Sequence, residues 1–123
     1  EKFKIDFDML PDGTTLAPGA FVDTQWSAYG VEIKAIRREN GAFVDGNWAR
    51  IFDSSNPTGD DRDLGSPNKN CPGCTSVEAC PGFAAQRNAG FLVANVTNCV
   101  AQNNILIIHE GSETDEPDDN LSG

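Results

Sequence analysis

An acidic segment offers the oxygen atoms that a divalent cation needs. Residues 51–68 read IFDSSNPTGDDRDLGSPN and contain four aspartates, two asparagines, two glycines and two prolines. The candidate oxygen donors are Asp53, Asn56, Asp60, Asp61, Asp63 and Asn68. Calcium accepts about six to eight oxygens in flexible geometry, and closely spaced carboxylates repel one another unless a cation neutralises them. The alternative is a solvated turn in which the side chains bond their own backbone.

This segment does not have the spacing of an EF-hand. A frame that starts at Asp53 puts Pro57 where a ligand is needed, Thr58 where a glycine is needed and Leu64 where the bidentate glutamate belongs. Any cation site here therefore has a different ligand arrangement.

Four cysteines form the second group of reactive side chains, and they are Cys71, Cys74, Cys80 and Cys99. The wide spacing of the last two argues against a zinc knuckle pair, so the even count predicts two disulfides. A direct Cys71–Cys74 bridge would close a very tight loop, and we expect each of these residues to pair with Cys80 or Cys99. Disulfides and the sequons at Asn95 and Asn120 indicate an oxidising, extracellular location.

Catalytic patterns are missing from the sequence. The one histidine, His109, follows the apolar run Ile105–Ile108, a position more typical of a structural side chain than of a catalytic base. No phosphate loop and no zinc-protease motif occur, and we expect a protein that is not an enzyme. The net charge of −10 argues against nucleic acid as a partner. No run approaches the ~20 apolar residues that membrane insertion needs. The charged first residues do not form a signal peptide, so a secreted protein would be the processed form.

The elements that must position these residues are strands. Residues 2–10 alternate, with Phe3, Ile5, Phe7 and Met9 on one face. Further strand patterns cover 20–38, 42–52 and 90–97, an ENG turn falls at 39–41, and residues 103–110 predict a central buried strand because both faces are apolar. The sequence therefore predicts one all-β domain over 1–123, a β-sandwich or jelly roll with a long Cys- and Asp-rich loop and an acidic tail at 111–123.

The ends of the chain suggest how copies could join. A patterned strand at 2–10 opens the chain, whereas nothing after residue 110 can pair with the strand at 103–110. Either an earlier strand of the same chain covers this edge, or a strand from a neighbouring copy completes the sandwich, and head-to-tail donation of the second kind produces a fibre. Residues 1–10 are the candidate donor.

Five segments together resemble a group of secreted or surface-anchored β-sandwich domains of bacteria and algae. These segments are IDFDMLPDGT, QWSAYGVEI, IFDSSNPTGDDRDLGSPN, NILIIHE and EPDDN. The resemblance implies a non-catalytic module of surface or matrix proteins with a divalent-cation site in the acidic loop. It also brings Glu110, Asp118 and Asp119 into the candidate ligand set. The chain departs from the group in its CPGC insertion and in lacking strands after the DD pair.

These inferences predict an extracellular structural module that binds calcium and assembles with copies of itself. The alternative is a calcium-dependent carbohydrate-binding module, because exposed aromatic rings of jelly rolls stack on sugars. The candidate stacking residues are Trp26, Tyr29 and Trp48, which would otherwise belong to the core.

Overall fold

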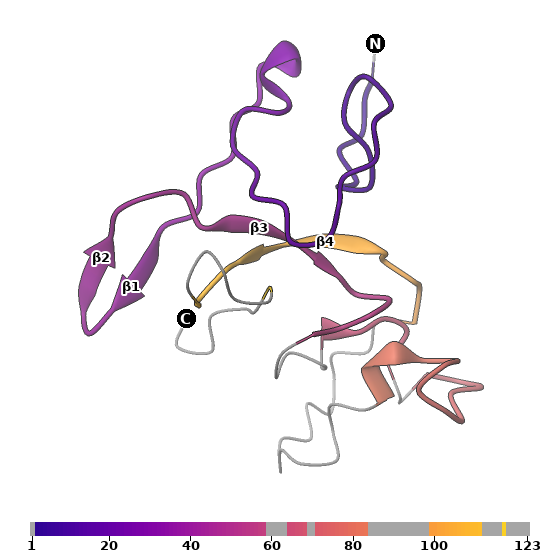
Figure 1. Cartoon of the computed structure of the whole chain (residues 1–123). Helices are drawn as coiled ribbons and strands as arrows, with labels where there is room; N and C mark the ends of the chain where they lie inside the picture. Colours follow the sequence, from indigo (N-terminus) through magenta and orange to yellow (C-terminus); the bar gives the residue numbers. More distant parts are fainter. Residues whose placement is uncertain (1, 59–63, 69–70, 84–98, 112–116, 118–123) are drawn as a thin grey trace. The chain divides into compact units, whose positions relative to one another are not determined.

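The computed structural model describes residues 2–58, 64–68, 71–83, 99–111 and 117. The chain divides into two compact units, unit 1 formed by Glu1–Phe52 and Asn104–Gly123 and unit 2 formed by Asp53–Asn103. Its regular elements are η1 (Ser27–Tyr29), β1 (Arg37–Glu39), β2 (Ala42–Val44), β3 (Ala49–Asp53), η3 (Pro81–Phe83) and β4 (Asn104–Ile108). Figure 1 shows them along the chain.

The strands form two small antiparallel sheets, one of β1 and β2 and the other of β3 and β4. The prediction of a β-rich chain is confirmed. The helical residues within the described ranges are in short 3₁₀ turns, η1, η3 and Leu64, and no helix there is long and apolar enough to cross a membrane.

The core of unit 1 lies on β3. Its first four residues are buried, and the cluster around them contains Leu16, Val22, Trp26, Ala49 and Ile51. The segment 19–22 runs beside β3, because the amides of Gly19 and Val22 donate to the carbonyls of Ile51 and Ala49 over 2.8 and 3.0 Å. β3 therefore lies between this segment and β4, as an inner strand.

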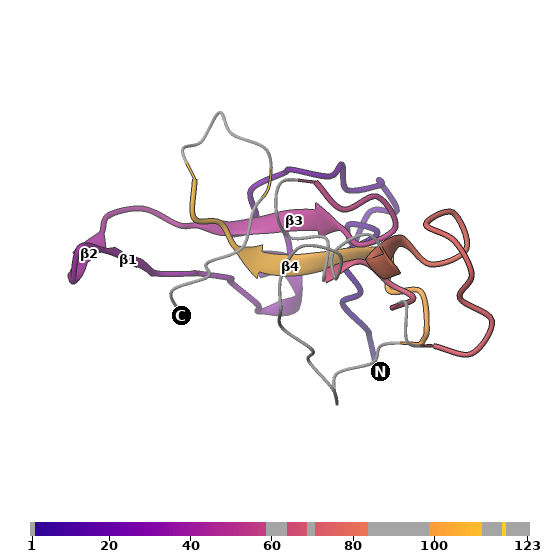
Figure 2. The ribbon, with the colours of Figure 1, turned by 90° about the horizontal axis from the view of Figure 1, so that it is seen from below.

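The prediction of a central buried strand at 103–110 is wrong for β4. Only Ile107 of its five residues is buried, and Ile108 is 43% exposed. Figure 2 shows β4 alongside β3, the only strand that pairs with it among the described residues. A strand that is apolar on both faces is usually the buried inner strand of a sheet. Here the inner strand is β3, whose buried residues have the sequence ARIF.

The expected strand over 2–10 does not form either. Residues 2–8 are irregular, and Met9 makes only an isolated bridge with Thr15. Phe7 has a φ of +63°, outside the extended region, and the Asp8 amide bonds the Asp6 side chain over 3.3 Å instead of a neighbouring strand. This local geometry breaks the alternation that the sequence shows.

The hairpin of β1 and β2 follows directly from its turn sequence. Asn40 and Gly41 both have positive φ, 48° and 82°, as a two-residue type I′ turn requires. The register pairs Arg37 with Val44, Arg38 with Phe43 and Glu39 with Ala42. The ENG segment was correctly predicted as a turn.

Two buried hydroxyls organise unit 2. Ser54 Oγ donates to the Asn103 carbonyl over 2.7 Å, so Ser66 Oγ must supply the proton of the 2.7 Å bond between the two hydroxyls. Ser66 Oγ in turn accepts from the Gln102 amide at 2.9 Å. Each hydroxyl is thus donor and acceptor, which joins three segments of the unit.

Candidate functional site

The predicted cation ligands are only partly within the described residues. Asp60, Asp61, Asp63, Asp118 and Asp119 lie outside them. Asp53 and Asn56 belong to unit 2, whereas Glu110 belongs to unit 1.

Asp53 is engaged in a local turn. Its Oδ1 accepts from the amide and hydroxyl of Ser55, at 2.9 and 2.5 Å. Nowhere in the described ranges do three acidic, histidine or cysteine side chains gather as a metal would require. Among these residues Asp53 follows the solvated-turn alternative, and calcium binding by the whole loop stays a prediction.

The two predicted disulfides are present. Cys71 pairs with Cys99 and Cys74 with Cys80, and the Cα separations are 5.4 and 5.6 Å. This agrees with the expectation that Cys71 and Cys74 do not bond each other. Crosslinks of this kind are typical of proteins that mature outside the reducing cytosol. The two sequons, Asn95 and Asn120, lie outside the described residues.

His109 is fully buried in unit 1. Its amide donates to the Trp48 carbonyl over 2.8 Å, and its Nε2 lies 3.1 Å from Nη1 of Arg50. A guanidinium only donates, so Nε2 accepts and the ring carries its proton on Nδ1. The ring also packs edge-on against Phe21, with centroids 6.1 Å apart. A nitrogen that accepts from arginine inside the unit is not placed to act as a base on a substrate.

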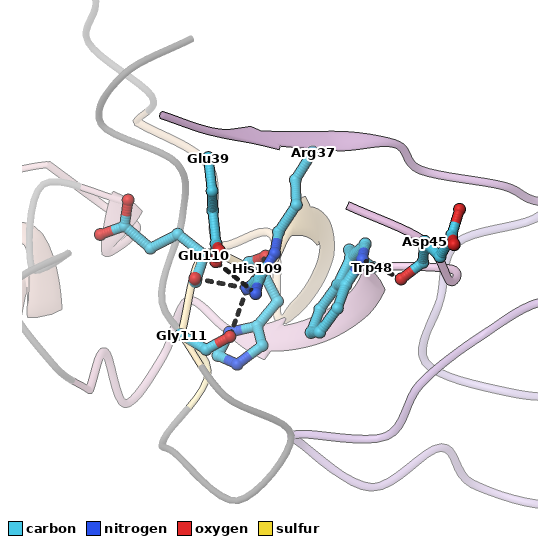
Figure 3. A network of polar contacts seen from close by, with 7 residues as sticks. All are labelled: Arg37, Glu39, Asp45, Trp48, His109, Glu110 and Gly111. Carbon is cyan, nitrogen blue, oxygen red and sulfur yellow. Dashed lines mark hydrogen bonds and ion pairs between the residues drawn. The ribbon is translucent and has the colours of Figure 1, made fainter. Parts of the chain in front are cut away.

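A network of polar contacts in unit 1 surrounds Arg37 (Figure 3). Its Nη1 donates to the backbone carbonyls of His109, Glu110 and Gly111, and its Nη2 lies 2.6 Å from Oε1 of Glu39. The guanidinium carbon is 3.5 Å from the ring centroid of Trp48, a cation–π contact. Arg37 therefore ties β1 to the segment that follows β4.

The contacts of the Arg37 cluster stabilise the fold of unit 1. Trp48 donates from Nε1 to the Asp45 carbonyl over 3.2 Å, which fixes the ring under the guanidinium. Arg37 itself is 7% exposed, so its charge interacts with groups of the same chain. Its Nε has no hydrogen-bond partner among the described residues. The contacts of Arg37 are those of an ion pair with Glu39 and a clamp on backbone carbonyls.

The candidate sugar-stacking residues fall into two groups. Trp26 is 1% exposed and sits in the core, and Trp48 lies beneath Arg37. Neither ring offers a free face to a sugar in this structure. Tyr29 is 41% exposed, and its ring lies 4.4 Å from that of Phe3. An exposed aromatic pair is thus what remains of the predicted stacking surface.

The proposed donor residues contact their own unit. Ile5 and Phe7 pack against the core cluster, whereas Phe3 and Met9 are exposed. Asn104 adds a polar clamp, because its amide donates to Asp8 Oδ1 over 3.0 Å and its Nδ2 to the Phe7 carbonyl over 3.1 Å. Donation of residues 1–10 to a neighbour would require these contacts to break.

Several structural residues were not found by sequence reasoning. Asn47 is the clearest: its side chain accepts from the amides of Ala35 and Ala49 and donates to the carbonyls of Val22 and Ile33, over 2.7 to 3.1 Å. It sits in a DGN sequence that reads as an ordinary turn. The hydrogen-bond partners of Asn47 are backbone atoms, which every residue carries. The sequence therefore does not mark them, and they are seen only in the structure.

Together these features define a disulfide-crosslinked, β-rich protein whose best-connected polar residues hold the chain. No protein-family model, curated protein or solved structure matches the sequence. The resemblance to secreted β-sandwich domains therefore stays a prediction.

Proposed function

We propose that this protein is a non-catalytic extracellular module that associates with copies of itself, and that calcium supports this association. The observation that carries the proposal is the small number of strands in each sheet. The described residues form sheets of two strands each, and a two-stranded sheet is marginal alone. Segment 19–22 bonds the outer side of β3, but no described strand pairs with the outer edge of β2 or of β4. Strands from another copy would complete a β-sandwich or jelly roll.

The cluster chemistry supports a structural role. The sole histidine accepts from Arg50 inside unit 1, and Arg37 is occupied by backbone carbonyls and Trp48. Among the described residues, the histidine and the buried Arg37 thus stabilise the fold through contacts within the chain. The two disulfides serve the same purpose, because crosslinks restrict the unfolded chain of a small domain.

Calcium would act on the acidic loop. The carboxylates of Asp60, Asp61 and Asp63 lie within four positions of a chain of net charge −10, and a divalent cation would remove their mutual repulsion. Glu110, Asp118 and Asp119 are further candidate ligands on the resemblance. Two copies would then approach with less like charge between them.

Sedimentation velocity and negative-stain electron microscopy, with calcium and after chelation, test this function. We expect concentration-dependent association with calcium and weaker association after chelation. Asp61→Asn should lose the calcium dependence, whereas Asp23→Asn, which changes an exposed aspartate outside the loop, should keep it. A chain that stays monomeric at all concentrations in both conditions overturns the proposal.

A carbohydrate-binding module is the second candidate, and the exposed Phe3–Tyr29 pair favours it. Glycan-array binding that Tyr29→Ala abolishes would support this function. Trp26→Ala is not a useful probe, because the buried ring belongs to the core.

A further inference from the structure

The hairpin of β1 and β2 has two unlike faces. Arg37 and Val44 share one face because they are paired in the register, and this face is anchored through Arg37. Arg38 and Phe43 are paired on the opposite face, where the Arg38 guanidinium carbon lies 4.6 Å from the Phe43 ring centroid. Phe43 is 68% exposed. In Figures 1 and 2 the hairpin projects beyond the start of β3.

The backbone of Phe43 is open as well as its side chain. The pair beside a two-residue turn, Glu39 and Ala42, is of the hydrogen-bonded kind, so Arg38 and Phe43 form the next, non-hydrogen-bonded pair. The amide and carbonyl of Phe43 consequently point away from β1, toward the outer edge of β2. No described strand pairs with that edge.

The β2 edge carries neither charge nor proline. Natural edge strands are protected against pairing by charged residues, by proline or by a very short length, and the three-residue β2, Ala42-Phe43-Val44, has only the last of these. The whole chain has a net charge of −10, so two copies repel over much of their surface. β2 itself is uncharged, and the Arg38 cation and the Asp45 carboxylate flank it, so two acidic copies can meet at this edge at a lower electrostatic cost than over the rest of their surface.

We propose that β2 pairs antiparallel with β2 of a second copy around a twofold axis through Phe43. Only the outward-pointing amide and carbonyl of Phe43 at the centre of β2 can make the central pair of bonds, which fixes the register. Ala42 then lies opposite Val44 of the second copy, and the two Phe43 rings lie side by side with an arginine outside each. The contact is isologous and closes as a dimer. It rests on the proposed self-association and names its surface.

Sedimentation velocity of the full chain and of two variants tests this contact. Phe43→Glu places two like charges opposite each other at the axis and removes the ring pair, and we expect at least about a tenfold weaker dimer. Val77→Glu is the matched control, because Val77 is an exposed apolar residue, 47% accessible, outside the hairpin, and this change of the same charge should leave dimerisation unchanged.

Amide exchange by NMR gives an independent readout that needs no variant. The Phe43 amide should exchange fast in dilute samples and become protected as concentration rises, whereas the Ala42 amide, bonded within the hairpin, should be protected throughout. Association that is unaffected by Phe43→Glu overturns the hairpin contact while self-association stands. A monomer at every concentration overturns both.

Discussion

Replacing Arg37 by methionine should destabilise unit 1 by about 2–3 kcal/mol. The guanidinium Nη1 has two protons for three carbonyls, so at most about two charge-assisted bonds of ~1.5 kcal/mol are lost. The stacking on Trp48 adds about 1 kcal/mol. About 1–2 kcal/mol of this lost stability is recovered, because burying methionine does not require the desolvation of a charge. The ion pair with Glu39 contributes little, since Glu39 is half exposed.

Urea unfolding followed by tryptophan fluorescence measures this cost. Both tryptophans belong to unit 1, so the signal reports the unit that contains Arg37. With a slope of about 1–2 kcal/mol per molar urea, the midpoint should fall by roughly 1–3 M.

Two variants serve as controls for Arg37. Arg37→Lys keeps the charge but loses the planar contact with Trp48, and it should fall between wild type and Arg37→Met. Glu39→Gln should change stability by less than about 1 kcal/mol. An Arg37→Met protein as stable as wild type, or more stable, would refute the reasoning, because it would show that burying the guanidinium costs as much as its contacts return.

Two further predictions concern unit 2 and the turn near the start of the chain. Ser54→Ala and Ser66→Ala should each cost about 2 kcal/mol in urea unfolding, because each leaves the other buried hydroxyl short of a partner. The double variant should then cost at least about 1 kcal/mol less than the sum, and strict additivity would argue against the shared bond. The backbone bond from Thr14, followed by the Thr14 side chain, lowers the pKa of Asp12. A lowered folded-state pKa gives stability that is present above the unfolded value and lost as pH falls through the folded one. Asp12→Asn, which can still accept the bond, should therefore show a smaller loss of melting temperature from pH 5 to pH 3 than wild type, and equal losses would contradict this role.

The parts of the structure that could be predicted are those set by short-range chemistry. The Asn40–Gly41 turn follows from two residues that tolerate positive φ, and it fixes the hairpin register. The number of possible cysteine pairings was reduced, because a bridge between Cys71 and Cys74 would close a very tight, strained loop. In both cases the deciding interactions join residues whose types and spacing are visible in the sequence.

The wrong and missing predictions share a different cause. The alternation over residues 2–10 is real, but Phe7 adopts a positive φ and the Asn104 side chain bonds its carbonyl. Arg37 is held by backbone carbonyls more than 70 residues away in sequence. Backbone partners are present at every position, so no pattern of side chains marks them. Of the acidic loop, the described Asp53 shows only a local turn.

The two adjacent arginines show how register assigns roles to identical side chains. Arg37 and Arg38 are consecutive, so in a strand they point to opposite faces. One is buried over Trp48 and the other lies over the exposed ring of Phe43. The Asn40–Gly41 turn decides which is which, because a shift of one residue would exchange the faces. It would expose the arginine that holds the segment after β4 and bury the ring that we assign to the contact between copies. The stability of unit 1 and its proposed association therefore depend on the same turn, although they use opposite faces of the hairpin.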